Sequence, residues 1–181
     1  MDTTTHSHAA TDNADPAECR ETLWKLIKGT RFGMFITHHE NGHLHSRPMT
    51  TQNKAIDEDD SLWFFMSRRG DSVADFAARP EVNVSYANPD DDNYVSVSGR
   101  ASVVVDPAKV DELWTKMAGA WFTGGQTDPD LALVQVRITH AHFWNVKENK
   151  LTQLYEMTKA AMTGKRPDIG HEGEVRMTAN H

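Results

Sequence analysis

The feature that most limits how this chain can fold is a series of strand-like segments joined mostly by short turns. The expected strands are residues 32–39, 43–52, 62–67, 81–87, 94–105, 131–139 and 141–147. Gly99 predicts a bulge or bend in the fifth segment, and a tight corner near His140 separates the last two. Six or seven strands in hairpin order predict a mainly β fold, an antiparallel barrel with peripheral helices, and argue against a parallel Rossmann sheet.

The clearest turn signal is Asn41-Gly42, because both residues tolerate the positive φ that a tight hairpin requires. The returning strand is expected to place three residues on one face: Arg47, Met49 and Thr51. Pro48 has no N–H to donate, so this strand is expected to have an edge or a bulge there. Residues 62–67 are apolar on both faces and are expected in the centre of the sheet.

Helical periodicity predicts four helices among these strands. The first begins at Asp15-Pro16 and ends at Gly29, and a closing helix covers residues 151–164. The second follows residues 68–72 and has an apolar stripe of Val73, Phe76 and Ala77. The third follows Asp106-Pro107 and has a stripe of Val110, Leu113, Trp114 and Met117. Residues 15–164 are therefore expected to form one domain, between a flexible tail (1–14) and a loose C-terminal tail (165–181).

Charge and composition exclude several classes of function. The net charge of −7 argues against general affinity for nucleic acid or an anionic membrane, because both need a basic face. No apolar run approaches the roughly 20 residues that span a bilayer, and the first residues lack a signal-peptide pattern. The single cysteine, Cys19, excludes an internal disulfide framework. A cytoplasmic protein is predicted.

Arg47 and the segment 68–72 suggest an anion site. Guanidinium groups and the backbone N–H groups at a helix N-terminus both favour a phosphate. Segment 68–72 supplies two arginines, followed by Gly70, Asp71 and Ser72 at the helix start. Two simpler interpretations stay open, in which Asp71 only caps its helix and the arginines are ordinary surface charges.

Two further groups of residues are candidates for ligand binding. The hairpin carries four histidines, His38, His39, His43 and His45, which could form a metal site. No cysteine or acidic residue completes an obvious ligand set, so no metal is predicted and metal binding stays the less favoured interpretation. Trp121 and Phe122 lie in an aromatic, glycine-rich loop, where they could cover a flat ring or form a subunit interface.

Several segments together resemble one family. They are His45-Ser46-Arg47-Pro48-Met49-Thr50, Leu62-Trp63-Phe64-Phe65-Met66-Ser67, Val82-Asn83-Val84-Ser85-Tyr86 and Tyr94-Val95-Ser96-Val97-Ser98-Gly99, followed by Trp121-Phe122, Asp128-Pro129-Asp130-Leu131, Val136 and Phe143-Trp144. Over residues 17–150 this order is similar to the pyridoxamine 5′-phosphate oxidase-like general stress proteins. The resemblance implies a split β-barrel that binds FMN, with FAD as the other candidate flavin, in a homodimer with two sites at the subunit interface.

The resemblance also implies the flavin-contacting positions. They are Arg47, Pro48, Met49 and Thr50 on the second strand, Phe65, Met66 and Ser67 on the third, then Arg68, Arg69, Asp71, Ser72 and Trp121. Members of the family commonly have Ser-x-Lys where this chain has Gly70 and Ser72, so Arg68 or Arg69 would have to replace the lysine. The substrate-phosphate residues of the true oxidases have no counterpart, so that activity is not predicted.

The function predicted from the sequence is a flavin-binding general stress protein. Two versions stay open: a flavin-dependent oxidoreductase that acts on a small molecule, and a non-catalytic protein that sequesters or senses flavin. No catalytic residue is assigned.

Overall fold

The structure is a computed structural model that describes residues 16–55, 60–145 and 171–176. The helices are α1 (Pro16–Lys28), α2 (Asp71–Ala78), α3 (Pro107–Leu113), α4 (Lys116–Trp121) and the 3-10 turn η1 (Gly125–Thr127). The strands are β1 (Gly33–His38), β2 (Leu44–Met49), β3 (Ser61–Ser67), β4 (Glu81–Asn88), β5 (Asn93–Val104), β6 (Leu131–Asn145) and β7 (His171–Arg176). No helix among these residues is long and apolar enough to cross a membrane.

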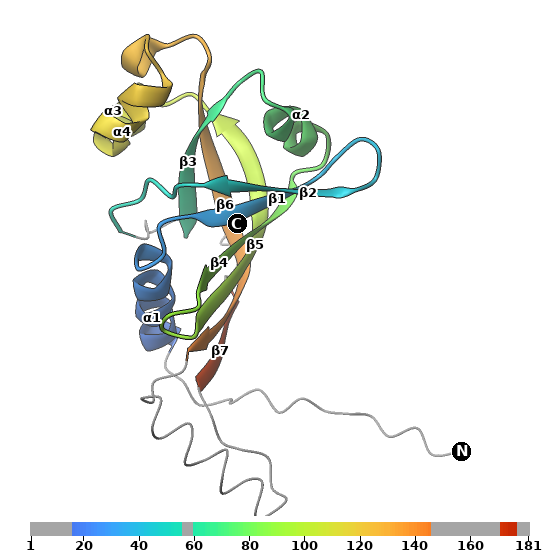
Figure 1. Cartoon of the computed structure of the whole chain (residues 1–181), viewed down its shortest axis with the longest axis vertical. Helices are drawn as coiled ribbons and strands as arrows, with labels where there is room; N and C mark the ends of the chain where they lie inside the picture. The colour runs from blue at the N-terminus through green and yellow to red at the C-terminus, as the bar shows by residue number, and fades with distance from the viewer. Residues whose placement is uncertain (1–15, 56–59, 146–170, 177–181) are drawn as a thin grey trace, which may run out of the picture.

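All seven strands form one antiparallel sheet. Their order is β2-β1-β4-β5-β6-β3, and β7 pairs with β6 outside this path. Figure 1 shows β1 and β2 crossing the long strands β5 and β6, so the sheet curls instead of lying flat. The same figure shows α2 beside the β1–β2 hairpin, and α3 with α4 at the opposite side of the upper end. The predicted antiparallel order is confirmed.

The main core lies inside this curl, and α1 covers it. Leu23 and Ile27 of α1 are buried with Phe35 of β1 and Phe64 of β3, whose rings meet edge to face at 5.3 Å between centroids. A second cluster packs the other face of β3 against α3 and α4. Burial of such apolar side chains contributes about 1.5–3 kcal/mol each, which makes these two clusters the main source of stability.

Strand β3 is buried on both faces, yet it is not central. Among the described residues it pairs with β6 alone. Its other side is covered by the segment that follows β2, where the Gln52 N–H donates to the Trp63 carbonyl at 2.8 Å. Asn53 completes this cover because its Oδ1 accepts the Trp63 N–H at 2.7 Å. The prediction of a central strand is wrong. Both faces of β3 are apolar because the main core packs on one face and α3 with α4 packs on the other, and not because β3 lies between two strands.

The β1–β2 hairpin is present, but with a different turn. Only Gly42 has a positive φ, +86°, and Asn41 does not. The Gly42 N–H donates to the His39 carbonyl, and the His39 N–H donates to the His43 carbonyl, each at 2.9 Å. These bonds give a three-residue loop with glycine in the left-handed position instead of a two-residue turn. The buried residues of β1 are Gly33, Phe35 and Thr37, so Phe32, Met34 and Ile36 lie on the more exposed face.

The last two predicted strands form one continuous strand, and the third predicted helix is divided into two helices. β6 runs unbroken from Leu131 to Asn145, and Thr139 is the extra residue where the pairing shifts opposite Ser98 and Gly99. The expected bulge at Gly99 and the expected corner near His140 are therefore the same β-bulge. The helical stripe ending at Met117 breaks at Trp114, because Thr115 caps a new helix and leaves Met117 exposed.

The C-terminal prediction is wrong in one segment. Residues 171–176, expected to be loose, form β7 and pair with β6. The Asp15 cap, the tail 1–14 and the closing helix 151–164 lie outside the described residues.

Candidate functional site

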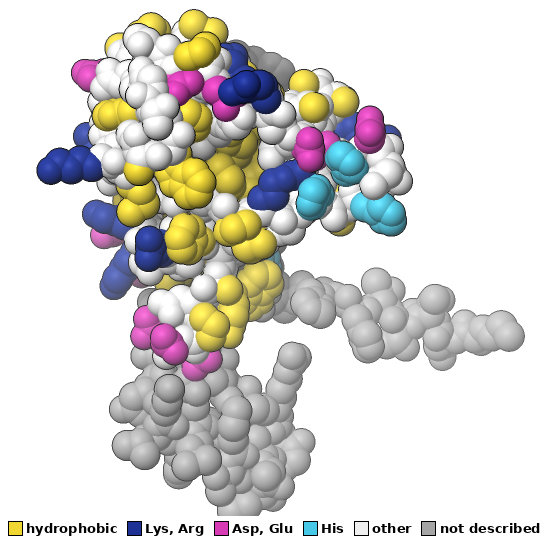
Figure 2. Space-filling view, turned by 45° about the horizontal axis from the view of Figure 1, so that its top comes forward, with side chains coloured by type: hydrophobic (Ala, Val, Ile, Leu, Met, Phe, Trp, Pro, Cys, Tyr) yellow, Lys and Arg dark blue, Asp and Glu magenta, His cyan; other side chains and the backbone are white. Residues whose placement is uncertain are grey.

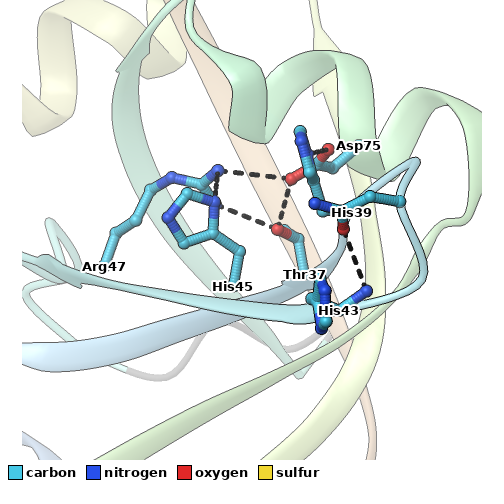
Figure 3. A network of polar contacts seen from close by, with 7 residues as sticks. Thr37, His39, His43, His45, Arg47 and Asp75 are labelled. Carbon is cyan, nitrogen blue, oxygen red and sulfur yellow. Dashed lines mark hydrogen bonds and ion pairs between the residues drawn. The ribbon is translucent and has the colours of Figure 1, made fainter.

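Arg47 is fixed where the β1–β2 hairpin meets α2. It lies on β2 opposite Phe35 of β1, and its side chain is 20% exposed. Its Nη1 donates to Thr37 Oγ1 at 2.9 Å, and its Nη2 lies 3.3 Å from Asp75 Oδ2 and 2.8 Å from His45 Nδ1. Figure 3 shows these side chains converging from β1, β2 and α2. The guanidinium is therefore held in one orientation by three neighbours.

Asp75 is the buried partner at the centre of this network. Its side chain is 3% exposed, and Thr37 donates its hydroxyl hydrogen to Oδ2 at 2.6 Å. His39 Nδ1 lies 2.8 Å from Oδ1. Burial is the largest influence on the carboxyl and raises its pKa, but the hydrogen bonds from Thr37, His39 and Arg47 together bring the pKa below its ordinary value. Asp75 is therefore a buried carboxylate that stays ionised.

Sequence patterns missed Asp75 and Thr37. The expected buried stripe of α2 was Val73, Phe76 and Ala77, whereas Ser72, Asp75 and Phe76 are buried and Ala77 is exposed. The signal available in the sequence was a carboxylate beside Phe76 on the inner helix face. Because an unpaired charge is rarely buried, such a carboxylate indicates a nearby cationic partner. Its partner Arg47 lies 28 residues away, on an element whose position no local pattern gives.

The start of α2 has no side-chain cap. Gly70 occupies the cap position and has no side chain that could accept a hydrogen bond from the first turn. The interpretation of Asp71 as a capping residue is therefore wrong, and Asp71 is exposed. Ser72 is buried at 9% exposure. The backbone N–H groups and the helix dipole at a helix N-terminus favour an anion.

Arg68 and Arg69 contact the start of β6 and the residue before it. The Arg68 Nε donates to the Leu131 carbonyl at 2.9 Å, and Arg69 Nε lies 3.0 Å from Asp130 Oδ1. Ser67 donates to the other oxygen of Asp130 at 2.8 Å. The hydrogen bonds from Arg69 and then from Ser67 lower the pKa of Asp130. Within the described residues, the contacts of Arg47 and those of these two arginines share no residue, so the contacts do not join them into one cluster.

The remaining predicted positions have different environments. Pro48 is exposed on β2, and since β2 is the terminal strand of the sheet path, the predicted edge is confirmed. Met49 packs partly against the main core, whereas Phe65 and Met66 are buried in the two clusters. Trp121 ends α4 and is 82% exposed, while its neighbour Phe122 is buried. The side chains of Phe65 and Met66 are therefore committed to packing.

A shallow pocket lies between α1 and the segment that follows β2. Its volume is about 230 Å³, and its lining residues are Trp24, Ile27, Lys28, Thr30, Arg31, Thr50, Thr51 and Asn53. Of the predicted positions, Thr50 is on this wall. Lys28 and Arg31 add positive charge to this wall, which no sequence motif indicated. A volume of this size is below the roughly 300 Å³ typical of small-molecule sites, so a flavin would need further walls.

The strands also expose large apolar side chains. Leu44 of β2 is 66% exposed, and Tyr94 of β5 faces Trp144 of β6 in the pairing register, at 40% and 42% exposure. Figure 2 shows apolar side chains in the middle of one face, and histidines gathered at its edge. Exposed apolar groups of this size commonly mark an interface.

Comparison with known proteins identifies the family. The sequence model of the pyridoxamine 5′-phosphate oxidase-like family matches residues 18–168. Protein bli-3 of Neurospora crassa is 26% identical, over 84% of this chain and 77% of that protein. General stress protein 26 from Jannaschia sp. CCS1 is 26% identical with a TM-score of 0.71, over 89% of this chain and 99% of that one.

A third relative is a flavin-binding protein. The general stress FMN/FAD binding protein from Xanthomonas citri is 34% identical with a TM-score of 0.62, over 74% of this chain and 92% of that one. The sheet topology and these matches confirm the predicted split β-barrel. The chain belongs to the pyridoxamine 5′-phosphate oxidase-like family, and its structural neighbours are general stress proteins.

Proposed function

We propose that this protein binds a flavin, FMN in preference to FAD, and that Arg47 is the principal contact to the phosphate. The Xanthomonas citri relative, an FMN/FAD binding protein, supports the choice of ligand. In this chain the proposal rests on one observation, the fixed orientation of the Arg47 guanidinium on edge strand β2. A guanidinium that is already ordered loses little conformational entropy when it binds a phosphate.

Arg47 keeps donors for such a ligand. Its contacts with Thr37, His45 and Asp75 use three N–H groups of the guanidinium. A guanidinium has five, so two remain for phosphate oxygens. Arg47 contacts α2 through Asp75, and the uncapped start of the same helix supplies further N–H donors. The neighbouring Asp75 carboxylate offsets part of the attraction, because it already neutralises one positive charge.

The flavin ring would lie along the outer edge of β2. The His39 N–H donates to the His43 carbonyl across the hairpin. Because bonding toward β1 alternates along the strand, the backbone N–H groups of Ser46 and of Thr50, which follows β2, turn away from β1. Such groups can pair with the pyrimidine edge of a flavin ring. The other predicted contacts, namely Pro48, Met49, Phe65, Met66, Ser67, Arg68, Arg69, Asp71, Ser72 and Trp121, stay predictions for this site.

The same proposal includes a homodimer. The pocket beside Thr50 is smaller than a flavin site needs, and a second copy would supply the missing wall. The exposed pair Tyr94 and Trp144 supports such an interface. A cytoplasmic location fits a chain whose single cysteine, Cys19, is free and buried.

Two roles are compatible with flavin binding. In the first, the protein is an oxidoreductase in which the flavin carries electrons to a small molecule and the chain positions the ring. In the second, it is a non-catalytic general stress protein that sequesters or senses flavin. The first role is tested by NAD(P)H consumption with added electron acceptors, and retained flavin without turnover favours the second.

The direct test is the cofactor content of protein purified from its own host. The protein is denatured, and the released small molecule is identified by absorbance and mass. The proposal expects FMN at about one molecule per chain. A protein that releases no flavin and takes up none when FMN is added contradicts it.

A further inference from the structure

Two histidines and a buried carboxylate meet beside Arg47. His39 follows β1, His45 is on β2, and Asp75 is on α2, so three elements bring them together. One potential ligand atom from each residue lies within 4.8 Å of the other two. His39 Nδ1 and Asp75 Oδ1 are already 2.8 Å apart, and the two imidazole centroids are 5.8 Å apart. Asp75 thus supplies the acidic ligand that was missing from the histidine pattern.

The two oxygens of Asp75 have different partners. Oδ2 accepts the Thr37 hydroxyl and lies near the Arg47 guanidinium, whereas Oδ1 faces His39 alone among the contacts of the described residues. Metal-binding carboxylates are typically oriented by hydrogen bonds of this kind to the non-ligating oxygen. An ion at Oδ1 would therefore find its carboxylate already positioned and would take the place of the proton shared with His39.

The geometry requires only small movements. Zinc-like ions lie about 2.0–2.2 Å from imidazole nitrogen and carboxylate oxygen, so His39 and Asp75 need to separate only slightly around an ion. His45 is exposed, so its ring can turn from Arg47 toward the ion at little packing cost. Solvent would fill the remaining coordination positions, since His45 lies at the surface.

The ligand types select the class of ion. Two imidazoles with one carboxylate suit zinc, cobalt, nickel, copper or ferrous iron, whereas magnesium and calcium prefer oxygen ligands throughout. Arg47 carries a positive charge beside the site, so it lowers the affinity for any cation. This repulsion favours an ion that gains strong bonds to nitrogen over an ion held by charge alone.

We propose that His39, His45 and Asp75 bind one divalent first-row transition-metal ion per chain. The site does not depend on the proposed flavin function, because it uses residues of the hairpin and α2 that need no flavin. The opposing interpretation is a hydrogen-bonded network with a structural role only.

The test is a cobalt titration of the untagged, flavin-free full chain, followed by visible absorption and by zinc competition. The proposal expects ligand-field bands that saturate at one cobalt per chain and disappear when zinc is added. His45→Gln is the main variant, because the exposed side chain can change without loss of the fold. It should weaken cobalt binding at least about tenfold, the lower limit seen even for residues that only orient a ligand.

The matched control is His43→Gln, which removes another exposed histidine from the same hairpin and should leave the affinity unchanged. The double variant His6→Gln/His8→Gln controls for the N-terminal histidines and should also bind normally. Cobalt should raise the melting temperature of the wild-type chain more than that of His45→Gln. Wild-type protein without saturable bands, equal binding by His45→Gln, or an equal loss in either control overturns the proposal.

Discussion

Arg47 and Asp75 form an ion pair between β2 and α2, with Nη2 3.3 Å from Oδ2 and the carboxylate almost fully buried. The pair links the edge hairpin to the helix that follows β3. It explains how an arginine on a strand with one free edge can stay ordered, because a buried carboxylate strongly favours an adjacent cation. It also means that any anion bound by Arg47 must share the guanidinium with a negative neighbour.

Replacing Arg47 should weaken flavin binding. We expect Arg47→Ala to raise the FMN dissociation constant by the equivalent of about 1–3 kcal/mol, the usual cost of losing a charge-assisted hydrogen bond. Fluorescence titration of FMN measures this change. Arg100→Ala is the control, because it removes an exposed arginine paired with Glu81 on another part of the sheet and should leave affinity unchanged. An unaltered affinity in Arg47→Ala contradicts the assigned role.

Acid should destabilise the protein through Asp75. Its folded-state pKa lies below the ordinary value of 3.8, so the folded state favours the ionised form. The resulting stability is complete above the unfolded pKa and is lost as pH falls from about 4 through the folded pKa. Urea unfolding at a series of pH values measures the slope. Asp75→Asn should be less stable at neutral pH and should show a shallower loss in this range; an identical slope would show that other carboxyls cause it.

The β-bulge between β5 and β6 should tolerate no side chain at Gly99. A Cβ at this position would lie 2.5 Å from the Arg137 carbonyl oxygen and 2.8 Å from a Val136 methyl group. We expect Gly99→Ala to lower the free energy of unfolding by about 1–3 kcal/mol, the cost of overpacking. Gly119→Ala, in α4, meets nothing closer than 3.8 Å and should raise stability by about 0.5–1 kcal/mol. Equal effects of the two substitutions would contradict this account.

A homodimer should depend on the exposed aromatic pair of β5 and β6. Trp144→Ser removes apolar area opposite Tyr94, and we expect it to weaken self-association by about 2 kcal/mol or more, as for a central interface residue. Sedimentation over a range of concentrations measures the association constant. Val105→Ser, at the residue that follows the other end of β5 and is 84% exposed, should have no effect. A wild-type chain that stays monomeric at all concentrations would remove the dimer from the proposal.

The sequence predicted the elements better than the contacts between them. Alternation and turn signals located β1, β2, β4 and β5, because these patterns depend on neighbours within a few residues. The bulge at Gly99 was predicted from one glycine, although its extra residue, Thr139, lies on the opposite strand. The break between α3 and α4 was missed because the capping hydroxyl of Thr115 outweighs an apolar stripe that continues past it.

The candidate site was predicted only in part. Arg47 was selected by its type and strand position, but Asp75 was not, because a helical pattern does not show which other element will cover it. The hairpin histidines were recognised as a group, and their acidic partner emerged only when α2 was placed against β1 and β2. Local periodicity groups residues along one element, whereas the face that becomes buried and the distant partner of each residue depend on the packing of whole elements.

The central claim is that this chain holds a flavin through its phosphate, and calorimetric titration of the flavin-free protein with FMN and with riboflavin tests it most directly. The two ligands share the ring, and only FMN carries the phosphate. We predict saturable FMN binding at one molecule per chain and riboflavin binding at least about tenfold weaker, as expected for the loss of charge-assisted bonds. No binding of FMN, or equal affinity for riboflavin, would contradict the claim.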